Sequence, residues 1–267
     1  KRQIFVIFLM LLSKYYADSP SAVATRTAEL INKVELNKSK QIMFSLICSL
    51  VFLIVFCLPL FQLIYWQLSE SSINLLSNIN LLINSSILGF AVGIFTIFFA
   101  TALSLSYRQS NKLKLLLSIS TSGYAIPGSV ISAGLLIGFD AIFGTSITIY
   151  GIFGLVLCLG LRFMTPAYNY SSASLANISK SSENALSLIP SNPLKAFSSF
   201  YYPQMKSALF LGFMIVFIES VKEQPATLLL RPVGFDTLST KIYNFTSEGE
   251  WEMAASPSLL LIFLSLV

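Results

Sequence analysis

The sequence is dominated by long apolar runs without charge, and these runs leave few folds open to the chain. They lie at 42–65, 87–105, 115–139, 141–161 and 207–218. A helix needs about 20 apolar residues to cross the roughly 30 Å core of a bilayer, so most of these runs can span a membrane. Only 11% of all residues are charged, too few to cover the surface of a soluble domain. The sequence therefore predicts an all-α, polytopic membrane protein.

Two partial apolar runs at the ends, 4–12 and 259–267, bring the expected number of spans to about six. Because no small-residue cleavage site follows the first run, we interpret it as the end of an earlier span of a longer protein rather than a signal peptide. The predicted layout is, in chain order: 1–13, the end of a preceding span; 14–41, a cytoplasmic linker; and 42–267, a transmembrane domain with a cytoplasmic loop at 163–206 and an external segment at 219–254.

The distribution of charge predicts the orientation of these spans. Most of the 17 Lys and Arg residues, Arg108 and Arg162 among them, fall on the side that carries loop 163–206. Lys222, Arg231 and Lys241 fall on the other side, together with most of the acidic residues, including Glu223. Short loops rich in Lys and Arg stay in the cytoplasm. The net charge of +5 is therefore explained by membrane orientation, and no nucleic-acid partner is needed.

The composition also excludes several kinds of chemistry. The chain has no His, which removes Ser-His-Asp triads and His-based metal sites. Its three Cys residues stand in apolar runs at unrelated spacings, typical of small core residues. No GxxxxGK[ST] phosphate-binding motif is present. We therefore expect no catalytic residue, no resident metal and no cofactor in this chain.

Residues 181–203 form the most informative part of the predicted cytoplasmic loop. Ser182 can cap a short helix, and Glu183 in its first turn suits the positive end of the helix dipole. Pro190 is expected to end that helix, and Asn192 followed by Pro193 to begin another. An apolar stripe follows at Leu194, Phe197 and Tyr201. Two capped helices with a sharp turn favour a rigid docking surface over a plain connector.

This loop resembles the "EAA" coupling loop of permease subunits in binding-protein-dependent ABC importers. The resemblance implies a type I permease (MetI-like) fold and a cytoplasmic ABC ATPase dimer that binds ATP and Mg²⁺. It also implies a periplasmic substrate-binding protein, a second permease half (a fused N-terminal repeat or another subunit) and a place in the lipid of a bacterial inner membrane. The residues that carry the coupling role by resemblance are Glu183, Asn184, Ala185, Pro190, Ser191, Pro193, Phe197 and Pro203.

Two further stretches, 123–130 and 222–238, are similar to segments of ferric-iron-type permeases. Pro127 between Gly123 and Gly128 predicts a helix break at membrane depth, where free backbone groups need protein or a water-lined path. A plain packing kink is an equal alternative. The glycine pairs 89/93 and 134/138 predict close helix packing. The gate and path candidates are Tyr124, Pro127, Gly128, Glu219, Lys222, Glu223, Pro225, Arg231 and Asp236.

The leading hypothesis is therefore a permease subunit of an ATP-driven importer, with ferric iron as the expected cargo. Sulfate, molybdate, thiamine and polyamines are alternative cargoes. An ion-coupled secondary transporter is the alternative mechanism, although the middle of every complete predicted span is uncharged. An intramembrane enzyme has no visible chemistry.

Overall fold

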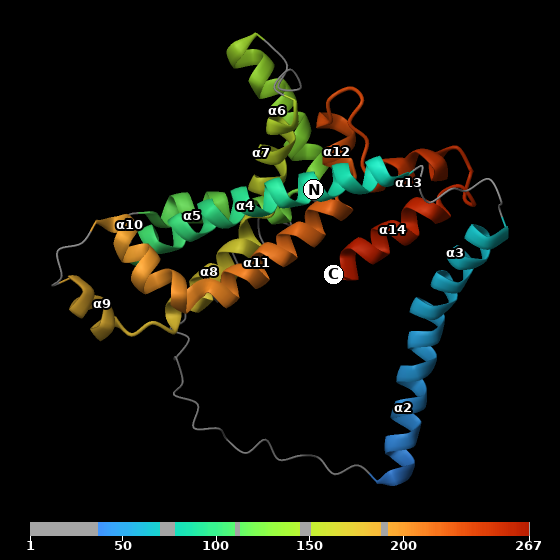
Figure 1. Cartoon of the computed structure of the whole chain (residues 1–267), viewed down its shortest axis with the longest axis horizontal. Helices are drawn as coiled ribbons and strands as arrows, with labels where there is room; N and C mark the ends of the chain where they lie inside the picture. The colour runs from blue at the N-terminus through green and yellow to red at the C-terminus, as the bar shows by residue number, and fades with distance from the viewer. Residues whose placement is uncertain (1–36, 70–77, 110–112, 145–150, 188–191, 267) are drawn as a thin grey trace, which may run out of the picture. The chain divides into compact units, whose positions relative to one another are not determined.

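The computed structural model describes residues 37–69, 78–109, 113–144, 151–187 and 192–266, and these contain helices but no strand (Figure 1). The described residues up to Val55 and those from Phe56 onward form two compact units. The helices are α2 (Lys38–Phe52), η1 (Leu53–Cys57), α3 (Leu58–Ser69), α4 (Ile79–Gln109), α5 (Lys114–Ser120), η4 (Gly123–Ala125), α6 (Gly128–Phe143), α7 (Ile152–Arg162), α8 (Met164–Ala176), α9 (Lys180–Ser187), α10 (Pro193–Ala196), η6 (Phe197–Tyr201), α11 (Tyr202–Lys222), α12 (Pro225–Leu230), α13 (Leu238–Ser247) and α14 (Ala255–Leu266).

Three helical stretches are long and apolar enough to cross a membrane alone: Lys38–Ser69, Ile79–Arg108 and Pro193–Lys222. Two bent pairs, α5 with α6 and α7 with α8, raise the number to 5 if each pair is one span. The helix α14 is apolar but shorter. In the first unit, α2 has no buried residue, as expected for a helix that faces lipid. The predicted all-α architecture is confirmed for the described residues.

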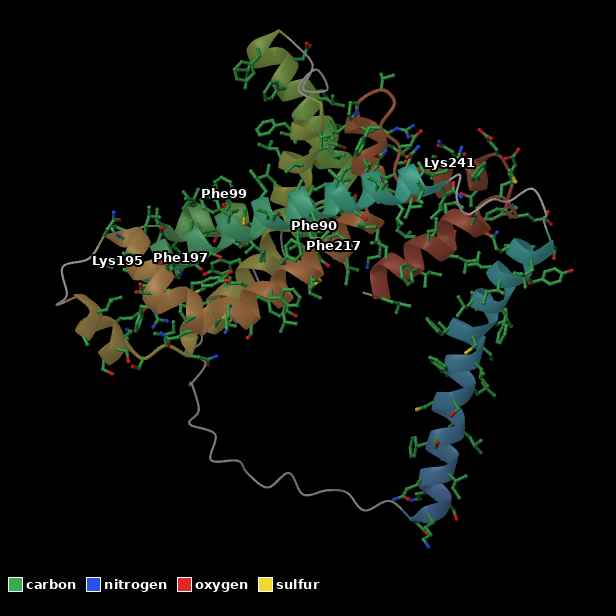
Figure 2. The ribbon with its side chains drawn as sticks, viewed as in Figure 1. Phe90, Phe99, Lys195, Phe197, Phe217 and Lys241 are labelled. Carbon is green, nitrogen blue, oxygen red and sulfur yellow. The ribbon has the colours of Figure 1, made fainter. Side chains whose placement is uncertain are left out.

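The helices α4, α8 and α11 pack on one another and form the main bundle of the second unit (Figure 1). A Cβ added at Gly89 would lie 2.7 Å from the ring of Phe217, and one at Gly93 would lie 2.6 Å from Phe213. Figure 2 shows Phe90 beside Phe217, and their ring centroids are 5.1 Å apart. Small residues let helix backbones approach where apolar burial gives little driving force. The close packing predicted at 89/93 is confirmed.

The second glycine pair does not behave like the first. A Cβ added at Gly134 or Gly138 of α6 would meet nothing within 4 Å. Both glycines have the same spacing as Gly89 and Gly93, but the spacing only permits a close approach and does not select a partner helix. The close packing predicted at 134/138 is therefore not seen among the described residues.

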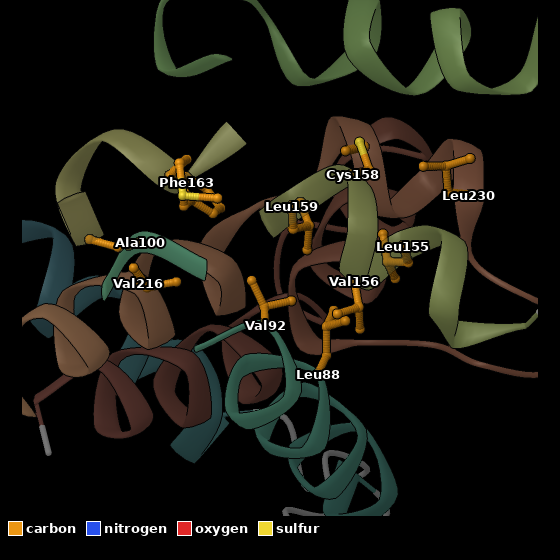
Figure 3. Close-up of a cluster of buried hydrophobic side chains, with 13 residues drawn as sticks. Leu88, Val92, Ala100, Leu155, Val156, Cys158, Leu159, Phe163, Val216 and Leu230 are labelled. Carbon is orange, nitrogen blue, oxygen red and sulfur yellow. The ribbon is translucent and has the colours of Figure 1, made fainter. Parts of the chain in front are cut away.

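Figure 3 shows the buried core that joins the main bundle to α7. Leu88 and Val92 of α4 lie with Leu155 and Leu159 of α7, and all four are at most 1% exposed. The helices α6, α7 and α12 also contact one another. This core fixes the end of α7, and with it Arg162, against the bundle.

The boundary between the predicted span 141–161 and the predicted loop 163–206 differs in the structure. α7 continues through a 56° bend into α8. Met164, Ala167 and Leu175 of α8 are buried, and α8 packs on α4 and α11. Residues 164–176 therefore belong to the helical bundle, and only the part from Asn177 onward connects it to α11.

The polar composition of α8 explains this difference. Its Ser, Tyr and Asn residues resemble those of a surface loop, but helical hydroxyl groups can bond to the backbone or across to a neighbouring helix. Ser174 donates to the carbonyl of Ser171 at 2.8 Å, and the hydroxyl groups of Ser171 and Thr101 on α4 lie 3.4 Å apart. A signal was available, because the sequence has no charged residue between Arg162 and Lys180.

Candidate coupling segment and translocation path

The helix α9 forms the first part of the predicted coupling segment. The hydroxyl oxygen of Ser179 accepts a hydrogen bond from the backbone N–H of Ser182 at 3.2 Å, so Ser179 acts at the helix start. The prediction of Ser182 as the cap is wrong, because an acceptor must precede the free amides of the first turn. Glu183 lies in that first turn, as predicted. Asn184 and Ala185 are exposed.

Arg108, at the end of α4, fastens α9 to the bundle. Its Nε lies 2.8 Å from Oε1 and 3.0 Å from Oε2 of Glu183. Its guanidinium also donates to the carbonyl of Ile178 at 2.5 Å and to the carbonyl of Leu175. Both side chains of the ion pair are about four-fifths buried, with 20% and 18% exposed. One guanidinium thus joins α4, the end of α8 and α9, a role that sequence reasoning missed.

The second part of the coupling segment begins as predicted. The side chain of Asn192 accepts a hydrogen bond from the N–H of Leu194 at 3.1 Å, and Pro193 is the first helical residue. Pro190 and Ser191 lie outside the described residues. Contrary to the prediction of a separate short helix, the helical path continues from Pro193 to Lys222. The π-helical turn η6 ends at Tyr201, and Pro203 is the second residue of α11, where the missing N–H of proline is tolerated.

The predicted apolar stripe is divided between the bundle and the surface. Tyr201 packs against a buried cluster that contains Leu175 and Met205. Phe197 is half-buried, whereas Leu194 is 78% exposed. Figure 2 shows Phe197 near Lys195 on the first turns of this helix. The exposed face available to a partner is therefore formed by Ala185, Leu194 and their neighbours.

The predicted helix break at 123–128 is confirmed. The pair formed by α5–η4 and α6 bends by 119°. A Cβ at Gly123 would lie 2.3 Å from the carbonyl oxygen of Leu161, so this position needs glycine for the break to pack against α7. Thr165 donates to the carbonyl of Thr121 at 2.5 Å. Pro127 precedes α6 directly, and Tyr124 is 52% exposed.

The break brings Gly128 against a buried ion pair. Nη2 of Arg162 lies 3.4 Å from Oε2 of Glu223, and the Glu223 side chain is 8% exposed. A Cβ at Gly128 would lie 2.2 Å from Oε1 of Glu223 and 2.6 Å from Nη1 of Arg162. Within the described part of the chain, Oε1 of Glu223 and Nε of Arg162 are buried without a hydrogen-bond partner. Nη1 of Arg162 donates to the carbonyl of Ile126 at 3.4 Å.

This ion pair corrects the predicted distribution of charge. The sequence pattern placed Arg162 on the cytoplasmic side and Glu223 on the outer side, but the two side chains are in contact. Arg162 stands at the bend between α7 and α8 rather than at the end of a span, and α12, just after Glu223, contacts α6 and α7. If α7 and α8 cross the membrane as one span, the charge of Arg162 lies within that span.

The other gate candidates form contacts of their own. Glu219 and Lys222 form an i, i+3 ion pair at 3.0 Å, with side chains 35% and 46% exposed. Pro225 begins α12. Arg231 forms an ion pair with Asp236. Of the predicted set, the structure thus brings together Pro127, Gly128 and Glu223, and adds Arg162, which sequence reasoning had treated only as a loop charge.

The segment after α12 is fixed to the bundle through backbone groups. The side-chain amide of Asn84 on α4 donates to the carbonyl of Asp236 at 2.9 Å, and the N–H of Leu238 donates to the Ser85 hydroxyl at 2.9 Å. Ser239 donates to the carbonyl of Glu223 at 3.3 Å. These bonds hold the backbone around Glu223 and leave its carboxylate toward Gly128.

The described residues contain no group of three or more Cys, Asp or Glu side chains that could hold a metal ion. The expectation that the chain binds no resident metal or cofactor stays a prediction.

Comparison with known proteins identifies the relatives of this chain. No family model matches the sequence. It is 24% identical over 229 residues to the Fe(3+)-transport system permease protein FbpB 2 of Haemophilus influenzae, which covers 81% of this chain and 44% of that protein. It is 29% identical over 122 residues to the ferric transport system permease protein FbpB of Actinobacillus pleuropneumoniae, covering 45% of this chain and 18% of that protein. The chain thus spans less than half the length of these curated relatives.

A structure of the MetNI methionine ABC transporter in inward-facing conformations shares the fold. The TM-score is 0.56 at 18% sequence identity, over 70% of this chain and 89% of that chain. The fold is that of an ABC importer permease. The predicted MetI-like architecture is confirmed, and so is the resemblance to ferric-type permeases. With its apolar helices, the chain is a multi-pass membrane protein.

Proposed function

We propose that the chain is the permease subunit of an ATP-driven importer that carries ferric iron into the cytoplasm of a bacterium, across its inner membrane. A periplasmic binding protein delivers the iron, and a partner ATPase dimer binds ATP and Mg²⁺. The chain itself performs no ATP hydrolysis and holds no cofactor. The names of the ferric-type relatives support the cargo. The observation that carries the proposal is the attachment of α9 to two spans through Arg108.

This attachment explains how work done outside the membrane reaches the spans. An ATPase that closes on nucleotide moves whatever docks on it, here the exposed face of α9 and the first turns of the helix 193–222. Because Arg108 bonds Glu183 and the end of α8, α9 cannot move without α4 and α8. The continuous helix 193–222 carries the same displacement to Lys222 and Glu223. A second permease half, fused or separate, completes the path.

The docking test uses the full transporter and an exposed residue, so that folding is preserved. Leu194→Asp places a charge on the proposed docking face, and we expect the partner ATPase to be lost on purification. Val233→Asp is the matched control, because Val233 is also exposed but lies after α12. Retention of the ATPase by Leu194→Asp, at wild-type yield, would contradict the proposed docking surface.

The cargo has its own test. Deletion of this chain should lower uptake of ferric iron and leave uptake of sulfate, molybdate, thiamine and polyamines unchanged. Normal iron uptake in the deletion strain would remove the assignment of iron and leave the importer.

One observation, the buried Arg162–Glu223 pair, favours the alternative of an ion-coupled secondary transporter, because ionisable groups among broken helices are typical of that class. The two mechanisms differ in their energy source. Transport in vesicles should require ATP and the partner ATPase. Uptake that follows a proton or sodium gradient without ATP would favour the secondary transporter.

A further inference from the structure

Arg162 and Glu223 stand where charges are expensive. Eleven residues of α7 lead to the bend at Arg162 and thirteen of α8 follow it. At about 1.5 Å per residue, each arm is about 16–20 Å long, close to half of a roughly 30 Å bilayer core. If the bent pair crosses as one span, Arg162 lies near mid-membrane. Charges at this depth occur in proteins mostly where they pair with one another or mark an ion path.

The Arg162–Glu223 pair lacks some of the hydrogen bonds that a purely structural ion pair would have. Its contact distance is 3.4 Å, and one oxygen of Glu223 and one nitrogen of Arg162 are buried without a partner among the described residues. Buried polar atoms are nearly always hydrogen-bonded, because an unmatched one loses its hydrogen bonds to water without gaining others. A pair maintained only for stability should have better geometry.

The pair also lies at the meeting point of three helix interruptions. Gly128 opens α6 after the 119° break, Arg162 stands at the 56° bend, and Glu223 separates α11 from α12. Non-helical backbone at membrane depth is tolerated only against protein or a water-lined path. Such interruptions are also the positions at which hinge motions are absorbed. A change of angle at any of them would separate the two side chains.

We propose that Arg162 and Glu223 form a counter-ion gate on the translocation path, in which a hard trivalent cation displaces Arg162 from the buried Glu223 carboxylate as it passes. The proposal rests on the proposed function and adds a contact point for the cargo. In the closed state Arg162 neutralises Glu223. When the helices tilt, the carboxylate becomes the acceptor for the cation.

The chemistry of the surroundings fits a passage rather than a storage site. Hard cations prefer oxygen ligands, and Oε1 of Glu223 is a buried carboxylate oxygen that has no hydrogen-bond partner among the described residues. The described residues do not group Glu223 with two further Cys, Asp or Glu side chains that could hold a metal ion. The displaced guanidinium already has another acceptor, the carbonyl of Ile126 at the helix break. Gly128 keeps the space beside Oε1 open, since a Cβ would fill it.

The test measures binding of Tb³⁺, a luminescent hard trivalent cation, to the purified transporter complex without its binding protein. Arg162→Gln removes the competing counter-ion, so we expect Tb³⁺ to bind about tenfold or more tightly than to the wild type. Glu223→Gln should abolish this site. Asp140→Asn is the matched control, because Asp140 is an exposed carboxylate on α6, and it should bind like the wild type.

Assembly is measured separately, so that two failures can be told apart. Co-purification of the ATPase should be unchanged in all three variants, and its loss from the wild type would overturn the proposed function instead. If Arg162→Gln does not fold, Arg162→Lys keeps the charge without the planar fork and should bind with intermediate affinity. Unchanged Tb³⁺ binding in the Arg162 variant, or full binding by Glu223→Gln, would overturn the gate. Binding of inorganic phosphate that requires Arg162 would also overturn it.

Discussion

Two partly buried Arg–Glu pairs among the described residues are built differently. Nε of Arg108 lies 2.8 Å from Oε1 of Glu183, and the same guanidinium also donates hydrogen bonds to two backbone carbonyls at the end of α8. Nη2 of Arg162 lies 3.4 Å from Oε2 of Glu223, and each side chain keeps one buried polar atom without a hydrogen-bond partner among the described residues. The first pair joins elements that must move together. The second lies between helix interruptions, where separation is possible.

The comparison suggests that satisfaction of hydrogen bonds, rather than burial, distinguishes a fixed junction from a gate. Both pairs join residues distant in sequence, and both lie against helix ends or bends. A satisfied pair resists separation because every donor would lose a partner. An unsatisfied pair can exchange partners at smaller cost. Substitutions at the two pairs should therefore have different consequences.

The largest effect is expected at the satisfied pair. Arg108→Met leaves Glu183 and two carbonyls without their donor, and breaking a buried pair in this way costs about 3–5 kcal/mol. Because both side chains are partly exposed, we expect the free energy of unfolding to fall by an amount near the lower end of this range, about 3 kcal/mol. Thermal unfolding of the purified complex and ATP-driven transport should both show the loss. The control is Lys206→Met, because Lys206 is an exposed basic residue on α11. An equal loss of stability and transport in both variants would contradict the proposed role of Arg108 in joining α4, α8 and α9.

An intermediate effect is expected from crowding the second pair. Gly128→Ala puts a methyl group 2.2 Å from Oε1 of Glu223, and overpacking of this kind costs about 1–3 kcal/mol. Gly134→Ala, in the same helix but facing open space, should be neutral or slightly stabilising. Thermal unfolding measures both. Transport should fall in Gly128→Ala alone; two equivalent variants would mean that Gly128 does not touch the pair.

The smallest effect is expected at the exposed pair. Lys222→Met removes the ion pair with Glu219, and exposed pairs contribute only about 0.2–1 kcal/mol. Stability and transport should therefore stay near wild-type values. If Lys222→Met lost as much stability as Arg108→Met, the Glu219–Lys222 pair would have to be more buried in the assembled transporter than it is in this chain.

Local features of the structure could be predicted from the sequence. Pro127 between two glycines predicted the helix break, and Asn192–Pro193 predicted the helix start. Each depends on residues within a few positions, where propensity and geometry are nearly sufficient.

Long-range contacts could not be predicted in the same way. Arg108 and Glu183 are separated by 75 residues, and nothing in the sequence around either residue indicates that the other is its partner. Arg162 was assigned to a loop because the polar composition of α8 hid a buried helix. The pairing of Gly89 and Gly93 with α11, but not of Gly134 and Gly138 with any described helix, likewise depends on the fold. The fold class was predictable from apolar runs, whereas the gate depends on how those runs bend.

The central claim is that the segment α9–α10 lies on the cytoplasmic side and docks on an ATPase. Labelling of Ala185→Cys in membrane vesicles with an impermeant maleimide tests it most directly, with the wild-type chain as background and Val233→Cys as the opposite-side control. We predict labelling of residue 185 in inverted vesicles alone, and protection when the ATPase is bound. Labelling from the outside, or labelling that the bound ATPase leaves unchanged, would contradict the account.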